Sequence, residues 1–319
     1  MHLSKYWESN LALGCDGTIV IVTDKPKKEV DNLFKNLWLE IFNFEKQFSR
    51  FLPDSELTKF NIRAGLETKI SDEFKELLLS SYKLSDLTNG LYNPFILPAL
   101  YRYGYNKSFI SSHINDLTPN YSASEVTDWK NLKIGTNGAK IPMNTAIDLG
   151  GCGKGYLADK LAEIIKSYEV NDFWVSLGGD IVASGNDVDY EPWNVYIQNA
   201  YDPSYSLEDA ISYSDKTLHI ASSGTIVRRS KINEKTYHHI IDPKTYKPAD
   251  TDVLLATVNA KSTLLADVLA SCAVILGSAK AIKKLRSMGA DGLIMQLDDG
   301  NAVGFGKIFN TFKAREVVK

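Results

Sequence analysis

The stretch Asp148-Leu-Gly-Gly-Cys-Gly-Lys-Gly-Tyr156 carries the densest signal in this sequence of 319 residues. The apolar segment Ala146 to Leu149 predicts a strand end, and the apolar spacing after Gly155 predicts a helix. Glycines let a backbone approach a ligand without a Cβ clash, and the first turn of a helix directs free N–H groups at an anion. We therefore expect a strand–turn–helix unit that cradles a phosphate or diphosphate, with Lys154 adding positive charge.

The glycine spacing excludes two familiar nucleotide motifs. The Gly-x4-Gly-Lys-Ser/Thr pattern of a Walker A loop is absent. The glycines also do not match the Gly-x-Gly-x-x-Gly pattern of a Rossmann fold. A tight strand-to-helix turn without any ligand stays open as the structural alternative.

Composition and charge describe a globular protein that does not favour nucleic acid. Hydrophobic residues make up 44% and charged residues 24% of the chain. Lys and Arg number 36 against 39 Asp and Glu, which gives a formal net charge of −3 rather than the basic excess of a nucleic-acid binder. No apolar run approaches the roughly 20 residues of a membrane-spanning helix, so we expect no membrane span.

Three cysteines, Cys15, Cys152 and Cys272, are too few and too far apart to suggest a disulfide framework or a zinc site. The first ten residues lack the apolar segment of a secretory signal, so we expect a cytoplasmic protein. The run Leu11-Ala-Leu-Gly-Cys15 superficially resembles a lipoprotein cleavage site. An exported lipoprotein is therefore the alternative if the given chain has been trimmed.

Apolar spacing predicts strands and helices without a regular βαβ alternation. The β-branched run Thr18 to Thr23 predicts a strand, and Leu265 to Leu276 predicts an apolar helix. A long helix should follow Pro26, with its buried face formed by Val30, Leu33, Phe34, Leu37, Ile41, Phe44 and Phe48. The fold class indicated is α+β or mixed α/β.

Two further segments carry residues suited to chemistry. Leu177-Gly-Gly-Asp180 predicts a turn that ends a strand with a carboxylate. The pair His238-His239 precedes Asp242-Pro243, and histidine can transfer protons near neutral pH. Successive residues of a strand face opposite sides, so at most one histidine of the pair should reach a site.

Asp267 and Ser271 lie four residues apart and so share one face of the apolar helix. A carboxylate on a buried helix is costly unless it is paired, hydrogen-bonded or bound to a metal. Carboxylate and hydroxyl oxygens suit Mg²⁺ or Ca²⁺. A salt bridge from Asp267 to a neighbour such as Lys261 is the structural alternative.

Taken in order, these segments resemble the FAD:protein FMN transferase family, also called the ApbE family. The resemblance covers most of the chain and implies one α+β domain over residues 1–319, with mixed sheets, packed helices and a T-fold-like core. Its motifs are Gly17-Thr18, Phe48-Ser-Arg-Phe51-x-Pro-Asp-Ser-Glu-Leu57, Gly90-Leu-Tyr-Asn93-Pro, the loop from Asp148 to Tyr156, Leu177-Gly-Gly-Asp180, Ser223-Gly224, His239-Ile-Ile-Asp-Pro243, and Ala266-Asp267 with Ser271.

The resemblance implies an Mg²⁺-dependent enzyme that moves FMN from FAD onto a threonine of an acceptor flavoprotein and releases AMP. It implies that the backbone oxygen of Gly151, Asp267 and Ser271 hold the metal, and that His239, Asp267 and Lys154 serve catalysis. The residues implied to contact FAD are Phe51, Leu91, Tyr92, Asn93, Asp148, Lys154, Gly179, Asp180, Ser223 and Ile241.

The sequence departs from the family pattern mainly around the nucleotide rings. Asp16 stands where the family usually has Met, Asn93 where it usually has Asp, and Thr225-Ile226 where it often has Asp-Tyr. Ser271 replaces a threonine but keeps the hydroxyl. Two other functions therefore stay open: an FAD pyrophosphatase that releases FMN and AMP, and a non-catalytic FAD-binding protein.

Overall fold

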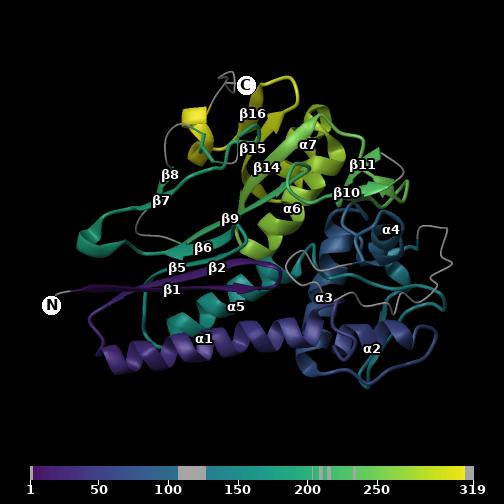
Figure 1. Ribbon diagram of the computed structural model, residues 1–319, viewed down its shortest axis with the longest axis horizontal. Coiled ribbons are helices and arrows are strands. Elements are labelled where there is room, and N and C mark those ends of the chain that lie inside the picture. Colours follow the sequence, from purple (N-terminus) through teal and green to yellow (C-terminus); the bar gives the residue numbers. More distant parts are fainter. Residues whose placement is uncertain are drawn as a thin grey trace.

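One eight-stranded antiparallel sheet organises the molecule, in the order β1-β2-β5-β6-β9-β14-β15-β16 (Figure 1). The absence of parallel pairing between these strands agrees with the α+β class expected from the missing βαβ alternation. In this computed structural model, the described residues are 3–106, 127–202, 204–207, 211–213, 217–232 and 235–312. The strands of the main sheet are β1 (Ser4–Ala12), β2 (Cys15–Thr23), β5 (Asp172–Leu177), β6 (Asp180–Ser184), β9 (Thr217–Gly224), β14 (Val253–Ala260), β15 (Ala290–Leu297) and β16 (Ala302–Phe305).

Short elements surround this sheet. Four two-stranded ribbons pair β3 (Lys133–Ile134) with β4 (Ala139–Lys140), β7 (Trp193–Val195) with β8 (Ile211–Tyr213), β10 (Arg229–Ile232) with β11 (Lys235–His238), and β12 (Ile241–Asp242) with β13 (Lys247–Pro248). The helices are α1 (Lys27–Phe48), α2 (Glu56–Ile62), α3 (Asp72–Leu87), α4 (Leu97–Arg102), α5 (Gly153–Ser167), α6 (Thr263–Leu276) and α7 (Ser278–Ser287). Short 3-10 turns are η1 (Pro94–Ile96), η2 (Trp129–Asn131), η3 (Val188–Tyr190) and η4 (Lys307–Phe312).

Helices cover one face of the sheet. α6 packs on β9 and β14, α5 packs on β5 and β6 beside α6, and α1 lies outside α5 (Figure 1). Every residue expected on the buried face of the long first helix is buried in α1. The opposite face of the sheet is covered by the β7–β8 ribbon and by the chain near η4, which bury residues such as Trp193 and Phe309.

The segment before the glycine-rich loop is not a strand, although its apolar character predicted a strand end. The buried side chain of Asn61 takes the place of a neighbouring strand. Its Nδ2 donates to the backbone oxygen of Ile147 (2.9 Å), and its Oδ1 accepts from the Ile147 N–H (2.9 Å). The Asp148 N–H donates to the oxygen of Pro94 (2.8 Å). The backbone N–H and C=O groups of Ile147 and the N–H of Asp148 thus have hydrogen-bond partners without a neighbouring strand.

The Leu177-Gly178-Gly179-Asp180 segment forms the tight turn that the sequence predicted. β5 and β6 pair directly on either side of it, and both glycines have left-handed φ values, +63° and +93°. A two-residue hairpin of this kind needs positive φ at both central positions, which explains the two glycines. The turn fixes Asp180 as the first residue of β6.

The three cysteines are free, as their spacing suggested. Cys15 begins β2, Cys152 precedes α5 and Cys272 lies in α6. Within the described ranges, none of the helices combines the length and apolar character that crossing a bilayer requires.

We predict that Asn61→Ala lowers the free energy of unfolding by about 2–4 kcal/mol, because a buried N–H and a buried C=O of Ile147 lose their partners. Urea denaturation measures the loss. Asn36→Ala is the matched control, since Asn36 is exposed and donates to the Tyr168 hydroxyl; it should cost no more than about 0.5 kcal/mol. Equal effects of the two substitutions would contradict this account of the segment.

Candidate functional site

A cavity of about 1180 Å³ opens where the glycine-rich loop meets the β1–β2 turn, the β5–β6 turn and the chain segments 222–230 and 239–241. Segments far apart in the sequence therefore build one site. Of the residues that the sequence analysis assigned to the site, only Asp180 does not line the cavity; those that do are Phe51, Leu91, Tyr92, Asn93, Asp148, Gly151, Lys154, Gly179, Ser223, His239, Ile241, Asp267 and Ser271.

Asp180 lies directly behind the cavity wall, where it is fully buried and forms an ion pair with Lys154. The Lys154 ammonium also lies 3.8 Å from Oδ2 of Asp267. Burial opposes the charge on Lys154, but the two carboxylates outweigh it and raise the pKa of the ammonium. Burial and the neighbouring Asp267 raise the pKa of Asp180 to about 7, against the lowering effect of Lys154.

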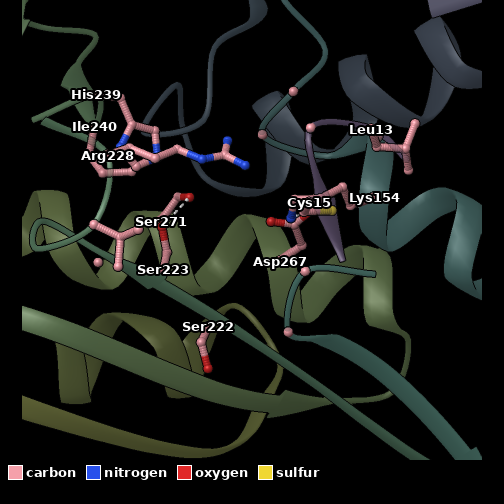
Figure 2. A pocket seen from close by; sticks show the side chains of 18 of the residues that line it. Leu13, Cys15, Lys154, Ser222, Ser223, Arg228, His239, Ile240, Asp267 and Ser271 are labelled. Atoms are coloured by element: carbon pink, nitrogen blue, oxygen red, sulfur yellow. Dashed lines mark hydrogen bonds and ion pairs between the residues drawn. The ribbon is translucent and has the colours of Figure 1, made fainter. Parts of the chain in front are cut away.

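The residues expected to hold a metal all line the cavity, Asp267 and Ser271 from α6 and Gly151 from the glycine-rich loop. Oδ2 of Asp267 accepts the backbone N–H of Gly155 (3.2 Å), and the hydroxyls of Ser271 and Ser223 lie 3.1 Å apart (Figure 2). Oδ1 of Asp180 has no partner in the part of the chain that the structure describes. No described group unites three or more His, Cys, Asp or Glu side chains. A carboxylate, a hydroxyl and a backbone oxygen fit Mg²⁺, which keeps most of its other positions for water and phosphate.

Asp148 holds the glycine-rich loop in shape. Its Oδ1 accepts the N–H of Gly150 (2.9 Å), and its Oδ2 accepts Nη1 of Arg50 (2.6 Å). Arg50 also stacks its guanidinium over the Phe51 ring, 4.5 Å from the ring centroid. Arg50 belongs to one of the family motifs, but no role could be predicted for it. Its partner lies 98 positions away, and such a pairing leaves no local sequence pattern.

Glycine at position 155 serves helix packing, and Gly155 does not line the cavity. A Cβ on Gly155 would lie 2.6 Å from the backbone oxygen of Thr263, at the start of α6. A Cβ on Gly151 would only touch the Tyr92 ring at 3.5 Å. The structural alternative for the loop therefore explains Gly155, while Gly151 leaves its backbone available at the cavity.

The polar groups of Tyr92 and Asn93 build the cavity wall. The Tyr92 hydroxyl lies within 3.0 Å of both the Ser81 hydroxyl and the Cys152 sulfur. Asn93 donates to the Thr127 oxygen and accepts the N–H of Phe95. Both side chains are thus fixed in place within the wall.

Only one histidine of the pair reaches the cavity, but β11 ends at His238, so the predicted alternation along a strand does not extend to His239. His239 lines it, whereas Nε2 of His238 lies 3.0 Å from the Ala249 oxygen outside it. Burial, followed by the positive charge of Arg228, lowers the pKa of His239 to about 3. Nδ1 of His239 has no hydrogen-bond partner among the described residues. The imidazole is therefore neutral at neutral pH.

The model of the ApbE family matches residues 13–294, which is most of the chain. The chain belongs to the ApbE family. Two curated relatives named "FAD:protein FMN transferase" are 26% identical over 298 residues (Haemophilus influenzae) and 28% identical over 312 residues (Treponema pallidum). The matches cover 89% and 92% of this chain, and 82% and 85% of those proteins.

Solved ApbE structures share the fold. The ApbE protein of Thermotoga maritima superposes with a TM-score of 0.83 at 23% identity, covering 98% of this chain and 100% of that one. The flavin transferase ApbE from Vibrio cholerae superposes with a TM-score of 0.78 at 24% identity, covering 97% and 99%. The expected ApbE membership and fold are confirmed, and so, at the level of the family, is the expectation of a transferase enzyme.

Arg228 also lines the cavity of this ApbE family member, although it was not among the predicted site residues. Figure 2 shows its side chain reaching into the cavity from the wall that carries His239 and Ile240. Arg228 comes shortly after Ser223-Gly224, in a stretch where Thr225-Ile226 already depart from the family pattern. An isolated arginine in a loop has no spacing that would single it out.

We predict that Lys154→Met lowers the free energy of unfolding by about 3–5 kcal/mol, because it leaves Asp180 buried beside Asp267 without a cation. Urea denaturation measures this loss. The double variant Lys154→Met/Asp180→Asn should recover much of it, because only the Asp267 carboxylate then remains without a cation. A double variant no more stable than Lys154→Met would contradict the ion-pair interpretation.

A second prediction concerns the dependence of stability on pH. Unfolded histidine has a pKa near 6.5, whereas that of His239 in the folded chain is lowered to about 3. The unfolded state therefore binds more protons between these values, so this contribution to stability is complete above pH 6.5 and is lost as the pH falls. Wild type should lose about 2 kcal/mol more than His239→Gln between pH 7 and pH 5. The free energy of unfolding is measured by urea denaturation at several pH values for both proteins. An equal dependence on pH in the two proteins would refute this prediction.

Proposed function

We propose that this ApbE family member transfers FMN from FAD to a threonine hydroxyl of an acceptor protein and releases AMP, in a reaction that depends on Mg²⁺. The observation that carries the proposal is the meeting of Lys154, Asp267 and Ser271 with the glycine-rich loop along one large cavity. The names of the relatives from Haemophilus influenzae and Treponema pallidum support the same activity. On this proposal, residues 1–319 act as one domain.

The reaction replaces the phosphoanhydride bond of FAD with a phosphate ester bond to threonine. The threonine oxygen attacks the phosphorus of the FMN half of FAD, the bond from that phosphorus to the oxygen of the AMP half breaks, and AMP departs. The hydroxyl must lose its proton. We assign this proton handling to His239, whose imidazole lines the cavity, is neutral at neutral pH and has no hydrogen-bond partner at Nδ1 among the described residues.

Asp267, Ser271 and the backbone oxygen of Gly151 would hold Mg²⁺ at the cavity. When bound, the metal supplies positive charge to phosphate oxygens. Lys154 keeps Asp267 and Asp180 in place beside the first turn of α5, whose N–H groups favour an anion. The proposal keeps the expectation that Lys154 helps to neutralise the diphosphate, but Lys154 divides its charge between the diphosphate and the two carboxylates.

The remaining predicted residues would enclose the nucleotide. Phe51, Leu91, Tyr92 and Ile241 offer apolar surface on the cavity wall. These positions suit the flat flavin and adenine rings because apolar and aromatic surfaces bury such rings well. The contacting set proposed from the sequence is completed by Asn93, Asp148, Gly179, Asp180 and Ser223.

The proposal is tested by incubating the protein with FAD, Mg²⁺ and a purified acceptor domain of a covalent flavoprotein expressed alongside it. We expect an FMN-sized mass increment on an acceptor threonine, with one AMP released per transfer. Chelation by EDTA should stop the transfer. Asp267→Asn should slow it by about 100-fold or more, while the exposed control Asp291→Asn should leave it unchanged.

Other outcomes identify the alternatives. Steady AMP release at the same rate without acceptor would replace the transferase with an FAD pyrophosphatase. FAD that stays intact with Mg²⁺ and acceptor would indicate a binding protein. Full transfer by Asp267→Asn would remove Asp267 from the metal site.

A further inference from the structure

Four permanently basic side chains line the cavity: Arg50, Lys154, Arg228 and Arg229. The carboxylates described above hold Arg50 and Lys154, and Nε of Arg229 donates to the Thr225 oxygen (2.8 Å). The side chain of Arg228 forms no hydrogen bond or ion pair within the described ranges. Among the described residues, Arg228 is therefore the cavity cation whose side chain has no hydrogen-bond or ion-pair partner.

Hydrogen bonds anchor both ends of the loop that carries Arg228. Arg228 ends the loop between β9 and β10, and its carbonyl oxygen accepts the Tyr105 hydroxyl (3.1 Å). At the other end of the loop, the N–H of Thr225 donates to the Leu254 oxygen (2.9 Å). These hydrogen bonds hold the loop that presents Arg228 to the cavity.

The Arg228 side chain extends between the two walls of the cavity. Figure 2 shows it leaving the wall of His239 and pointing toward Cys15 and Lys154 on the opposite side. Burial raises the pKa of the Cys15 thiol, and the charges of Lys154 and Arg228 act against this rise. Burial lowers the pKa of His239, and the charge of Arg228 adds to this effect. The guanidinium thus lies within electrostatic range of both walls.

We propose that Arg228 binds the diphosphate of the nucleotide and supplies most of the protein's own charge to it. This inference rests on the proposed function, because it assumes that FAD occupies the cavity. A planar guanidinium can donate two parallel N–H bonds to phosphate oxygens and stays charged at all relevant pH values.

Lys154 cannot take this role with its full charge. Its ammonium already balances Asp180 and Asp267, and withdrawing it would leave two adjacent buried carboxylates. Arg228 moves toward a phosphate without breaking any interaction that the described residues make with its side chain. The cost of recruiting a cation is therefore lowest at Arg228.

The test compares the binding of ADP, which carries a diphosphate, with that of riboflavin, which carries none, by calorimetry in the presence of Mg²⁺. Arg228→Met should weaken ADP binding by about ten- to a hundredfold and leave riboflavin binding unchanged. It should also flatten the dependence of the ADP affinity on salt concentration. Arg228→Lys should recover part of the affinity. The control Arg63→Met removes an exposed arginine outside the cavity and should bind ADP like wild type.

Three results would overturn the inference. These are ADP affinity of Arg228→Met within twofold of wild type, equal loss of ADP and riboflavin binding, and no ADP binding by wild type. Urea denaturation of each variant separates misfolding from loss of a contact, and Arg228→Lys provides the second variant. If wild type binds ADP through Arg228 but transfers no FMN, the proposed function fails and this inference stands. If transfer occurs while Arg228→Met keeps its ADP affinity, the reverse holds.

Discussion

The buried ion pair between Lys154 and Asp180, with Asp267 beside it, is the interaction on which the site depends. It joins three elements that are far apart in the sequence, α5, β6 and α6. Each charge would be costly to bury alone, and the two carboxylates would repel each other without the ammonium between them. The cluster therefore requires α5 and α6 to meet at the start of β6, beside the cavity that Lys154 and Asp267 line.

The close approach of α5 and α6 follows from residues on both helices. Gly155 has no Cβ where one would press against the Thr263 oxygen. One turn further along α5, the Asp159 carboxylate accepts the N–H groups of Thr263 and Leu264, each at 2.9 Å. A side chain of one helix thus satisfies the free N–H groups at the start of the other. The position of Asp267, one turn into α6, is a consequence of this contact.

The sequence could predict those parts of the site that depend on local spacing. Asp267 and Ser271 are four residues apart on an apolar helix, and α6 does direct both into the cavity. Contacts between distant segments left no such pattern. The Asn61 side chain forms hydrogen bonds with the backbone of Ile147, 86 residues away, and Arg50 pairs with Asp148 across 98 positions. Each is a polar side chain whose partner is set by tertiary packing. The prediction of a strand end before the loop is wrong because no local pattern reveals the hydrogen bonds from Asn61.

The charges of the cavity also bear on how its histidine could work. Burial, followed by the positive charge of Arg228, keeps the pKa of His239 low. A phosphate bound at Arg228 would offset the second of these causes, while the imidazole would stay buried. The imidazole would then become a better proton acceptor only when the diphosphate is present. The same arginine would then hold the substrate and control the basicity of His239. The imidazole would be a good proton acceptor only when bound FAD presents a phosphorus for the hydroxyl to attack.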